Sequence, residues 1–208
     1  GGTEHMSDSF TVRLARDAAD VAAAQRLRYD VFVAELGGDG PLVDHENRLE
    51  RDRFDPFFDH LLVCDPARGD MVVGVYRLLR DDRAAEAGQF YSEDEYDLGP
   101  LRRSGRRLLE LGRSCLHPNH RGGPALMALW QGLAEYVARQ NIDILFGTAS
   151  FHGTDLTALL NPISHLHAAY LAPEHLRVTS RMGGDLALLP PDRIDRRTFM
   201  AALCASLP

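Results

Sequence analysis

The segment Leu108–Met127 constrains the fold of this chain more than any other stretch, because it joins three kinds of element in a fixed order. It opens with an apolar run that carries only two charges, Glu110 and Arg113. A polar loop with two adjacent glycines follows, and Pro124 opens an apolar-periodic stretch. This order predicts a buried strand, a glycine-containing loop and a helix with proline at its first position. Backbone N–H groups at such a helix start can bind an anion, so we expect either a phosphate site or an ordinary tight turn.

The remaining periodicities predict an α/β domain of layered strands and helices. Alternating or continuous apolar runs predict further strands at 10–15, 60–65, 71–79, 142–149 and 177–180. Helical spacing predicts helices at 18–36, 124–139, 154–160, 163–171 and 195–205, the first capped by Asp17 and ended by Gly37-Gly38. The charged stretch 37–59 is expected to be a loop whose apolar residues pack part of it down as a lid, and the polar stretches 81–88 and 90–97 to be a connection with helical tendency and a loop.

Composition excludes several classes of protein. A formal net charge of −7 argues against a general nucleic-acid binder, although all 23 basic residues are arginine. No apolar run approaches the roughly 18 residues of a membrane helix. The three cysteines form no CxxC pair and no metal-ligand spacing occurs, so we expect a cytoplasmic protein with buried thiols and no metal. Residues 1–6 are expected to be the remnant of an expression tag, and 7–208 a single domain.

The two charges of the predicted central strand are the first candidates for chemistry. Glu110 and Arg113 are three positions apart, so a regular strand would place them on opposite faces. A β-bulge at Gly112 would rotate Arg113 to the Glu110 side and release a backbone N–H. Such an N–H can stabilise an oxyanion or polarise a carbonyl. The alternative is a structural Glu–Arg pair without chemistry.

Three other groups of polar residues leave two interpretations open. His117 can act as a general acid or base, or only stabilise a turn. The carboxylates of Glu93, Asp94 and Glu95 can form a solvated loop or bind a cationic substrate. The stretch 101–107 is a basic patch in an acidic chain, which fits either a solvated loop or a docking surface for an acidic partner.

The strand–loop–helix segment, with Arg121 before the glycines, resembles the pantetheine-pyrophosphate site of the GNAT acyltransferase superfamily. That loop usually reads Q/R-x-x-G-x-G/A, and this chain departs from the pattern at its second glycine. One similar branch is the acyl-homoserine-lactone (autoinducer) synthases. Their pattern matches Arg28-x-x-x-Phe32, Asp52-x-x-Asp55, Arg77 and Glu110-x-x-Arg113, whereas their tryptophan after the first helix is absent here.

The L-ornithine Nα-acyltransferases are the second similar branch, and the chain resembles them along most of residues 26–178. The most specific segments are LELGRSCLHP, FYSEDEYDL and SFHGTD. The resemblance implies a GNAT-like acyl-CoA N-acyltransferase fold, a central mixed β-sheet with helices on both faces. It also implies transfer of a 3-hydroxyacyl chain from acyl carrier protein to the α-amine of L-ornithine, which gives lyso-ornithine lipid. The family commonly continues beyond the position where Pro208 ends this chain.

The resemblance also assigns roles to residues. Catalysis falls to Glu110, Gly112 and Arg113, with Glu110 accepting the ammonium proton. Binding of the donor's 4′-phosphopantetheine, or of a coenzyme A thioester, falls to His117, Arg121, Gly122, Gly123 and Ala125, and no cofactor is bound permanently. Binding of the acceptor falls to Arg28, Phe32, Arg77, Tyr91, Glu93 and Ser150, with Arg28 or Arg77 on its carboxylate.

The expected partners follow from the same resemblance. Acyl carrier protein would dock on Arg102, Arg103, Arg106 and Arg107, and the enzyme could contact the inner face of the membrane peripherally. Two rival functions stay open at this point. One is an autoinducer synthase with a pocket for S-adenosylmethionine. The other is a catalytically silent module that binds acyl carrier protein or acyl chains.

Overall fold

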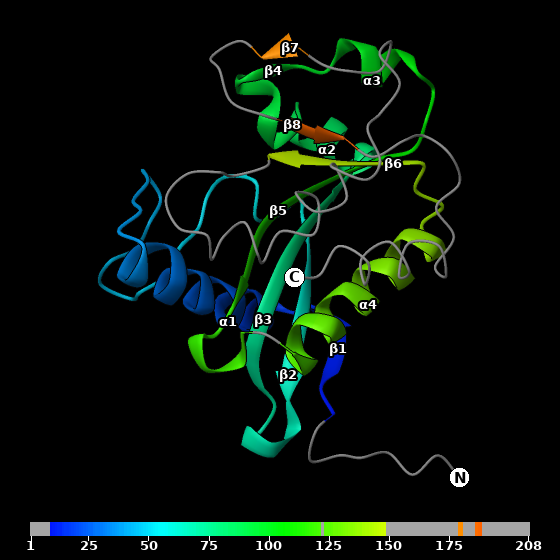
Figure 1. The fold of residues 1–208 in the computed structure, drawn as a ribbon. Helices are drawn as coiled ribbons and strands as arrows, with labels where there is room; N and C mark the ends of the chain where they lie inside the picture. Colours follow the sequence, from blue (N-terminus) through cyan, green and yellow to red (C-terminus); the bar gives the residue numbers. More distant parts are fainter. Residues whose placement is uncertain (1–8, 122, 149–178, 181–185, 189–208) are drawn as a thin grey trace, which may run out of the picture. The chain divides into compact units, whose positions relative to one another are not determined.

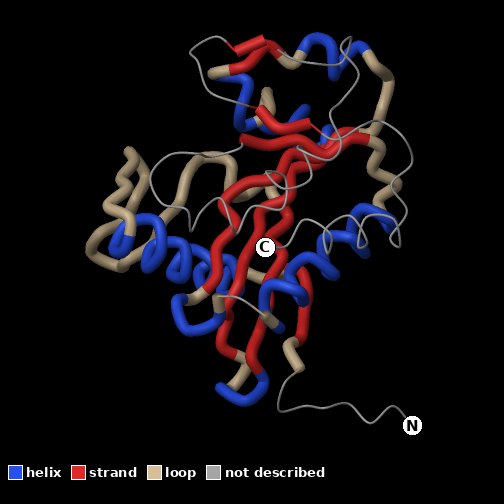
Figure 2. Tube along the Cα trace, in the orientation of Figure 1, coloured by secondary structure: helices blue, strands red, loops and turns tan. Residues whose placement is uncertain are grey.

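The computed structural model describes residues 9–121, 123–148, 179–180 and 186–188 (Figures 1 and 2). Six strands form one mixed sheet in the order β1-β2-β3-β5-β6-β8. They are β1 (Thr11–Leu14), β2 (Asp59–Asp65), β3 (Met71–Arg80), β5 (Leu108–Leu116), β6 (Ile144–Thr148) and β8 (Leu186–Leu188). A separate antiparallel pair joins β4 (Tyr96–Asp97) to β7 (Thr179–Ser180). The strands predicted from apolar runs are confirmed within the described residues, and positions 149 and 177–178 of these predictions lie outside them. β4 and β8 were not predicted.

The helices described are α1 (Ala18–Arg28), α2 (Asp81–Ala87), α3 (Gly99–Arg103) and α4 (Pro124–Arg139). Short 3₁₀ turns occur at Pro66–Arg68, Tyr91–Asp94 and Pro118–His120. The predicted helices at 154–160, 163–171 and 195–205 lie outside the described residues, as do the expected tag remnant, Gly122 and Ser150. Contacts divide the chain into two compact units, which are described separately below. The first holds residues up to Arg77 with Arg113–Gly132, and the second holds Leu78–Gly112 with the described residues from Leu133 onward.

In the first unit, both faces of β2 are buried because its residues alternate between two helices. Leu62 and Cys64 pack in one cluster with Ala24 and Leu27 of α1. On the other face α4 approaches so closely that a Cβ at Gly132 would lie 3.3 Å from Leu61 and 2.4 Å from Val12 of β1. Alternation of this kind requires apolar residues at every position, which explains the continuous apolar run of β2.

The first long helix changes its winding where the site begins. The Asp17 side chain accepts a hydrogen bond from the Asp20 N–H and caps α1, as predicted. From Tyr29 to Glu35 the chain continues as a π-helix, and the Leu36 N–H donates to the oxygen of Val31, five residues earlier. The predicted helix 18–36 therefore has the expected extent but contains a π-helical turn, a feature that occurs frequently at functional sites.

In the second unit, β5 and β6 form the parallel pair around which the other described parts pack. Their register pairs Leu108 with Ile144 and Glu110 with Phe146. The ring of Phe90 meets Phe146 edge to face, with centroids 5.0 Å apart. β8 pairs with β6 antiparallel. This arrangement holds the turn after Phe90 beside the residue that pairs with Glu110.

Candidate active site

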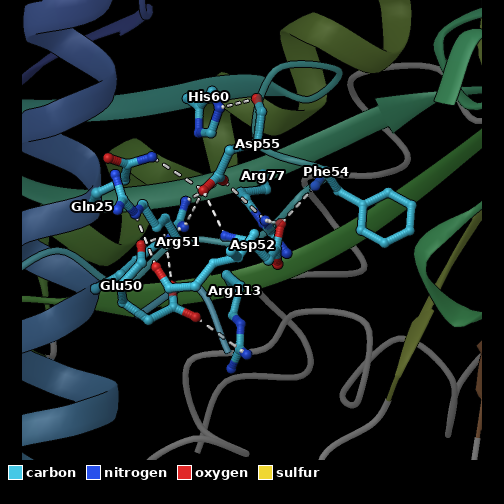
Figure 3. Close-up of polar contacts among 11 residues, drawn as sticks. Gln25, Glu50, Arg51, Asp52, Phe54, Asp55, His60, Arg77 and Arg113 are labelled. Carbon is cyan, nitrogen blue, oxygen red and sulfur yellow. Dashed lines mark hydrogen bonds and ion pairs between the residues drawn. The ribbon is translucent and has the colours of Figure 1, made fainter. Parts of the chain in front are cut away.

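Charged side chains of the first unit form a buried cluster, drawn in Figure 3. Two arginines and two carboxylates are its centre: Arg28 from the end of α1, Arg77 from β3, and Glu50 and Asp55 from the loop before β2. All four side chains are at most 5% exposed. Burying unpaired charges would cost several kcal/mol each, so this cluster can exist only with its partners in place.

Asp55 lies at the centre of the cluster and accepts hydrogen bonds on both oxygens. Oδ1 receives Nη1 of Arg28 at 2.9 Å and Nη1 of Arg77 at 3.0 Å. Oδ2 receives Nη2 of Arg28 at 2.9 Å and Nε2 of Gln25 at 3.1 Å. Burial alone would raise the pKa of Asp55, but the charge and hydrogen bonds of Arg28, followed by Arg77, outweigh it and lower that pKa.

Arg28 donates most of its guanidinium N–H groups to other members of the cluster. Its Nε donates to Glu50 at 2.7 Å, and Nη2 donates also to the Glu50 carbonyl oxygen at 2.7 Å. With the two bonds to Asp55, four of the five N–H groups of this guanidinium are donated within the cluster. Burial lowers the pKa of Arg28, but Asp55 and Glu50 more than compensate and raise it, so the group stays charged.

The loop sequence explains why the carboxylates reach this position. Asp52 accepts a hydrogen bond from the N–H of Phe54 at 2.9 Å, which forms a tight Asx-type turn. The rings of Phe54 and Phe58 are buried, and Arg77 lies over the Phe58 ring at 4.1 Å from its centroid. The expectation that 37–59 is a loop with parts packed down is confirmed at these rings, whereas Leu42 is 48% exposed.

Asp52 and His60 also belong to the first-unit cluster. Asp52 Oδ1 also accepts Nη1 of Arg77 at 2.9 Å. The Nε2 atom of His60 lies 2.9 Å from the Asp55 carbonyl oxygen, and burial lowers the pKa of His60, which favours the neutral imidazole. Sequence reasoning missed Glu50, because in the run ENRLERDRFD nothing distinguishes a buried carboxylate from its solvated neighbours. Only the need to neutralise Arg28 could have indicated it.

Arg113 joins this cluster at its edge. Its Nη2 lies 3.2 Å from Oε1 of Glu50, and its guanidinium lies over the ring of Phe32, 5.1 Å from the centroid. Its backbone has a φ of 54°, which is unusual for a residue with a side chain. β5 therefore contains a left-handed residue, which is Arg113, and the bulge at Gly112 stays a prediction.

In the second unit, the Glu110 carboxylate is buried and holds a turn. It accepts the backbone N–H of Tyr91 at 2.7 Å, the N–H of Ser92 at 3.0 Å and the Ser92 hydroxyl at 2.5 Å. The stretch 90–97, expected to be a loop, therefore contains a 3₁₀ turn at Tyr91–Asp94. Glu93 closes this turn on the Phe90 N–H at 2.7 Å and pairs with Arg102. The proton-acceptor role of Glu110 stays a prediction.

The predicted donor loop lies in the first unit at the start of α4. Gly123 has a φ of 112°, and its carbonyl oxygen accepts the N–H of Met127 at 3.1 Å, the first bond of the helix. Ala125 is buried. Arg121 donates through Nη1 and Nη2 to both carboxylate oxygens of Glu35, at 3.0 and 2.6 Å. This is a bidentate anion contact of the geometry that a phosphate could also make.

The predicted turn histidine and basic patch are both found at the surface or close to it. His117 accepts the Asn119 N–H on Nδ1 at 3.2 Å, and burial, followed by the charge of His120, lowers its pKa. This contact fits the structural interpretation of His117. The side chains of Arg102, Arg103, Arg106 and Arg107 are all exposed.

Of the described residues, no three histidine, cysteine or carboxylate side chains are grouped so as to hold a metal ion. The described helices also include none that is both long and apolar enough to cross a membrane. Cys64 and Cys115 are buried free thiols, as predicted, and burial raises the pKa of Cys115 to about 12. Cys204 lies outside the described residues.

Comparisons with known proteins agree with this architecture. Residues 27–131 match the family model described as acetyltransferase (GNAT) domain. A protein from Rhodobacter capsulatus named L-ornithine N(alpha)-acyltransferase is 58% identical over 94% of this chain and 77% of its own length. A protein of the same name from Brucella abortus is 44% identical over 94% of this chain and 72% of its own length.

Among solved structures, a CoA-dependent acyl-homoserine lactone synthase, BjaI, superposes with a TM-score of 0.56. It shares 18% sequence identity, over 92% of this chain and 84% of the other, and this likeness shows the fold alone. The predicted GNAT-like fold and the predicted resemblance are confirmed. The chain is an N-acyltransferase of the GNAT superfamily and, within it, belongs to the family of the L-ornithine Nα-acyltransferases.

Proposed function

We propose that this enzyme transfers a 3-hydroxyacyl chain from acyl carrier protein to the α-amine of L-ornithine and releases lyso-ornithine lipid. One observation carries the proposal: the Rhodobacter capsulatus relative named for acylating the α-nitrogen of ornithine is 58% identical over 94% of this chain. Relatives from Brucella abortus and Rhizobium meliloti, at 44% and 38% identity, carry the same name.

The reaction itself sets what the site must supply. The α-amine attacks the thioester carbonyl, a C–N bond forms, the C–S bond breaks, and the pantetheine thiol leaves. The carbonyl oxygen gains negative charge in the transition state, and the attacking nitrogen must lose a proton. A backbone N–H beside the left-handed residue Arg113 polarises the carbonyl, and Glu110, directly or through water, accepts the proton.

Support for this assignment comes from β5 and the strand beside it. The register of β5 with β6 ends at the pair Glu110–Phe146, although both strands continue. A strand whose pairing register ends and which then adopts a left-handed conformation is a place where a backbone N–H can turn toward a substrate. Glu110 also fixes the Tyr91–Asp94 turn, so its removal would affect the position of Tyr91 and Glu93, the predicted acceptor-binding residues.

The donor is a substrate and not a resident cofactor in this proposal. Arg121 and the N-terminus of α4, including Gly123 and Ala125, hold the phosphate of 4′-phosphopantetheine. His117 contributes to the same loop. Acyl carrier protein docks on the exposed patch Arg102, Arg103, Arg106 and Arg107. We further propose that residues 7–208 act as one acyltransferase domain, in the cytoplasm, with peripheral contact to the inner membrane face where the lipid product is released.

Product identification tests the proposal most completely. Purified enzyme is incubated with 3-hydroxypalmitoyl acyl carrier protein and, in separate reactions, ornithine, lysine, glutamine, glycine or S-adenosylmethionine. A mass spectrum with N-acylated ornithine supports the proposal. An acyl-homoserine lactone formed from S-adenosylmethionine would identify an autoinducer synthase. Carrier-protein binding without a product from any acceptor would support the silent module.

Replacement of the predicted base separates catalysis from binding. Glu110→Gln removes the proton acceptor and is expected to lower kcat about 10²- to 10⁴-fold. Glu86→Gln is the matched control, because Glu86 is an exposed carboxylate paired with Arg83 on a surface helix. Ornithine acylation by Glu110→Gln at the rate of Glu86→Gln would refute the role of Glu110.

A further inference from the structure

We infer that Arg113 is the residue that binds the α-carboxylate of the amino-acid acceptor. The inference rests on the proposed function and deepens it, because it assigns acceptor recognition to one side chain. An enzyme that acylates an α-amine must hold the adjacent carboxylate in a fixed place, and a guanidinium group does so with two parallel hydrogen bonds.

The other arginines of the buried cluster are engaged by its own carboxylates. Arg28 is 0% exposed and donates four hydrogen bonds to Glu50 and Asp55. Arg77 is 1% exposed and is paired with Asp52 and Asp55. A substrate carboxylate could reach either guanidinium only by breaking these pairs. The predicted role of Arg28 or Arg77 in binding the acceptor's carboxylate is therefore reassigned in this proposal.

Arg113 differs from both in exposure and in pairing. Its side chain is 35% exposed. It shares Glu50 with Arg28, and its contact of 3.2 Å is longer than the 2.7 Å contact of Arg28 with the same carboxylate. The described carboxylates therefore neutralise the charge of Arg113 only in part, and about a third of its side chain is exposed.

The surroundings of Arg113 fix the direction of its side chain. The guanidinium carbon of Arg113 lies over the ring of Phe32, 5.1 Å from its centroid, and this cation–π contact restricts where the side chain can lie. At the neighbouring Gly112, no atom of the other described residues beyond its two chain neighbours lies within 4 Å of the position that a Cβ would take. A left-handed backbone at a residue with a side chain is strained, and such residues cluster at functional sites.

The charge balance of the cluster fits an incoming amino acid. Three guanidinium groups (Arg28, Arg77, Arg113) pair with three carboxylates (Glu50, Asp52, Asp55). Figure 3 labels Arg77 and Arg113 beside these carboxylates. After Arg113, the most exposed member is Asp52, at 25%. The α-amino acid part of ornithine is zwitterionic, and its δ-ammonium adds one positive charge. Its carboxylate gives Arg113 the partner that Glu50 supplies only in part.

The test compares L-ornithine with L-ornithinamide, which keeps both amines and replaces the carboxylate with a neutral amide. Wild type is expected to lose about 10- to 100-fold in kcat/KM on the amide. Arg113→Ala should lose a similar factor on ornithine and discriminate little between the two acceptors. Arg113→Lys, which keeps the charge without the planar fork, should lie between them. If Arg113 were only structural, its replacement would lower kcat/KM for ornithine and for ornithinamide alike, and the ratio between the two would stay that of wild type.

Arg48→Ala is the matched control, because Arg48 also has a left-handed backbone, pairs with one carboxylate at 3.1 Å and lies over an aromatic ring. It should discriminate like wild type. Arg113→Ala or Arg113→Lys with undiminished discrimination would overturn the inference. If wild type does not acylate ornithine, the proposed function fails, and the same comparison is made with the amino acid that it does accept and its amide. The role of Arg113 is then judged on carboxylate dependence alone.

Discussion

Replacement of Asp55 by asparagine should destabilise the fold far more than its loss of one charge suggests. Each Asp55 oxygen accepts at least two donors: Oδ1 from Arg28 and Arg77, and Oδ2 from Arg28, Gln25 and the N–H of Asp52. Whichever oxygen becomes the amide nitrogen, its own hydrogens then face those donors. Two buried guanidinium groups also lose the carboxylate that neutralises them.

The magnitude follows from the burial of the partners. Breaking a buried ion pair by removing one member costs about 3–5 kcal/mol, because the remaining charge stays uncompensated. A protein of this size has about 5–15 kcal/mol of total stability, and each kcal/mol corresponds to about 2–4 °C. Asp55→Asn should therefore lower the midpoint of thermal unfolding by about 10 °C and reduce the free energy of unfolding in urea by about 3–5 kcal/mol.

The control is Asp30→Asn, because Asp30 pairs with Arg48 at 3.1 Å where both side chains are exposed. Such a pair contributes about 0–1 kcal/mol. A free energy of unfolding for Asp55→Asn within about 1 kcal/mol of wild type would refute the reasoning. The pH dependence gives an independent check. Since the folded-state pKa of Asp55 lies below its ordinary value of 3.8, wild type loses this stabilisation as pH falls below 3.8, whereas Asp55→Asn lacks it at every pH.

Three further predictions follow from single contacts. The folded-state pKa of His60 lies below 6.5, so the free energy of unfolding of wild type should decrease as pH drops below that value. Urea unfolding at pH 8 and pH 5.5 should show a smaller decrease for His60→Gln than for wild type, and equal decreases would contradict this. Gly147→Ala would place a Cβ 2.5 Å from a backbone oxygen of β5 and should lower the midpoint of thermal unfolding by several degrees. Gly112→Ala should not lower it, because among the described residues only its chain neighbours lie within 4 Å of the new Cβ; equal midpoints for the two variants would refute this argument. Glu35→Gln releases Arg121 from its carboxylate partner and should lower the KM for the acyl donor a few-fold in a steady-state assay. A higher KM would count against the proposal that Arg121 binds the donor's phosphate.

The sequence predicted most of the elements of the fold, because burial on both faces leaves a continuous apolar run. β2, β3 and β5 were recognised in this way, and α4 by its proline start and helical spacing. The π-helical winding at Tyr29–Glu35 was not predicted, because one residue more per turn does not change the apolar pattern visibly. Two-residue strands such as β4 are set by their partners and have no pattern of their own.

The candidate site was predicted less completely, because residue type does not reveal burial. Arg28, Arg77 and Asp55 were identified through a resemblance, yet their burial became visible only in the structure. Glu50 was missed for the same reason. At Glu110 the sequence indicated chemistry, and the structure added the turn that its carboxylate holds through the backbone of Tyr91 and Ser92. A distant loop supplies these partners, and no local spacing encodes that contact.

The release of free thiol from 3-hydroxyacyl acyl carrier protein, measured as the concentration of L-ornithine is varied, tests the central claim most directly. We expect a rate that rises with ornithine, saturates, and matches the rate of N-acylated ornithine formation. We also expect that S-adenosylmethionine does not replace ornithine. A rate of thiol release that is independent of ornithine, or that depends on S-adenosylmethionine instead, would contradict the proposed function.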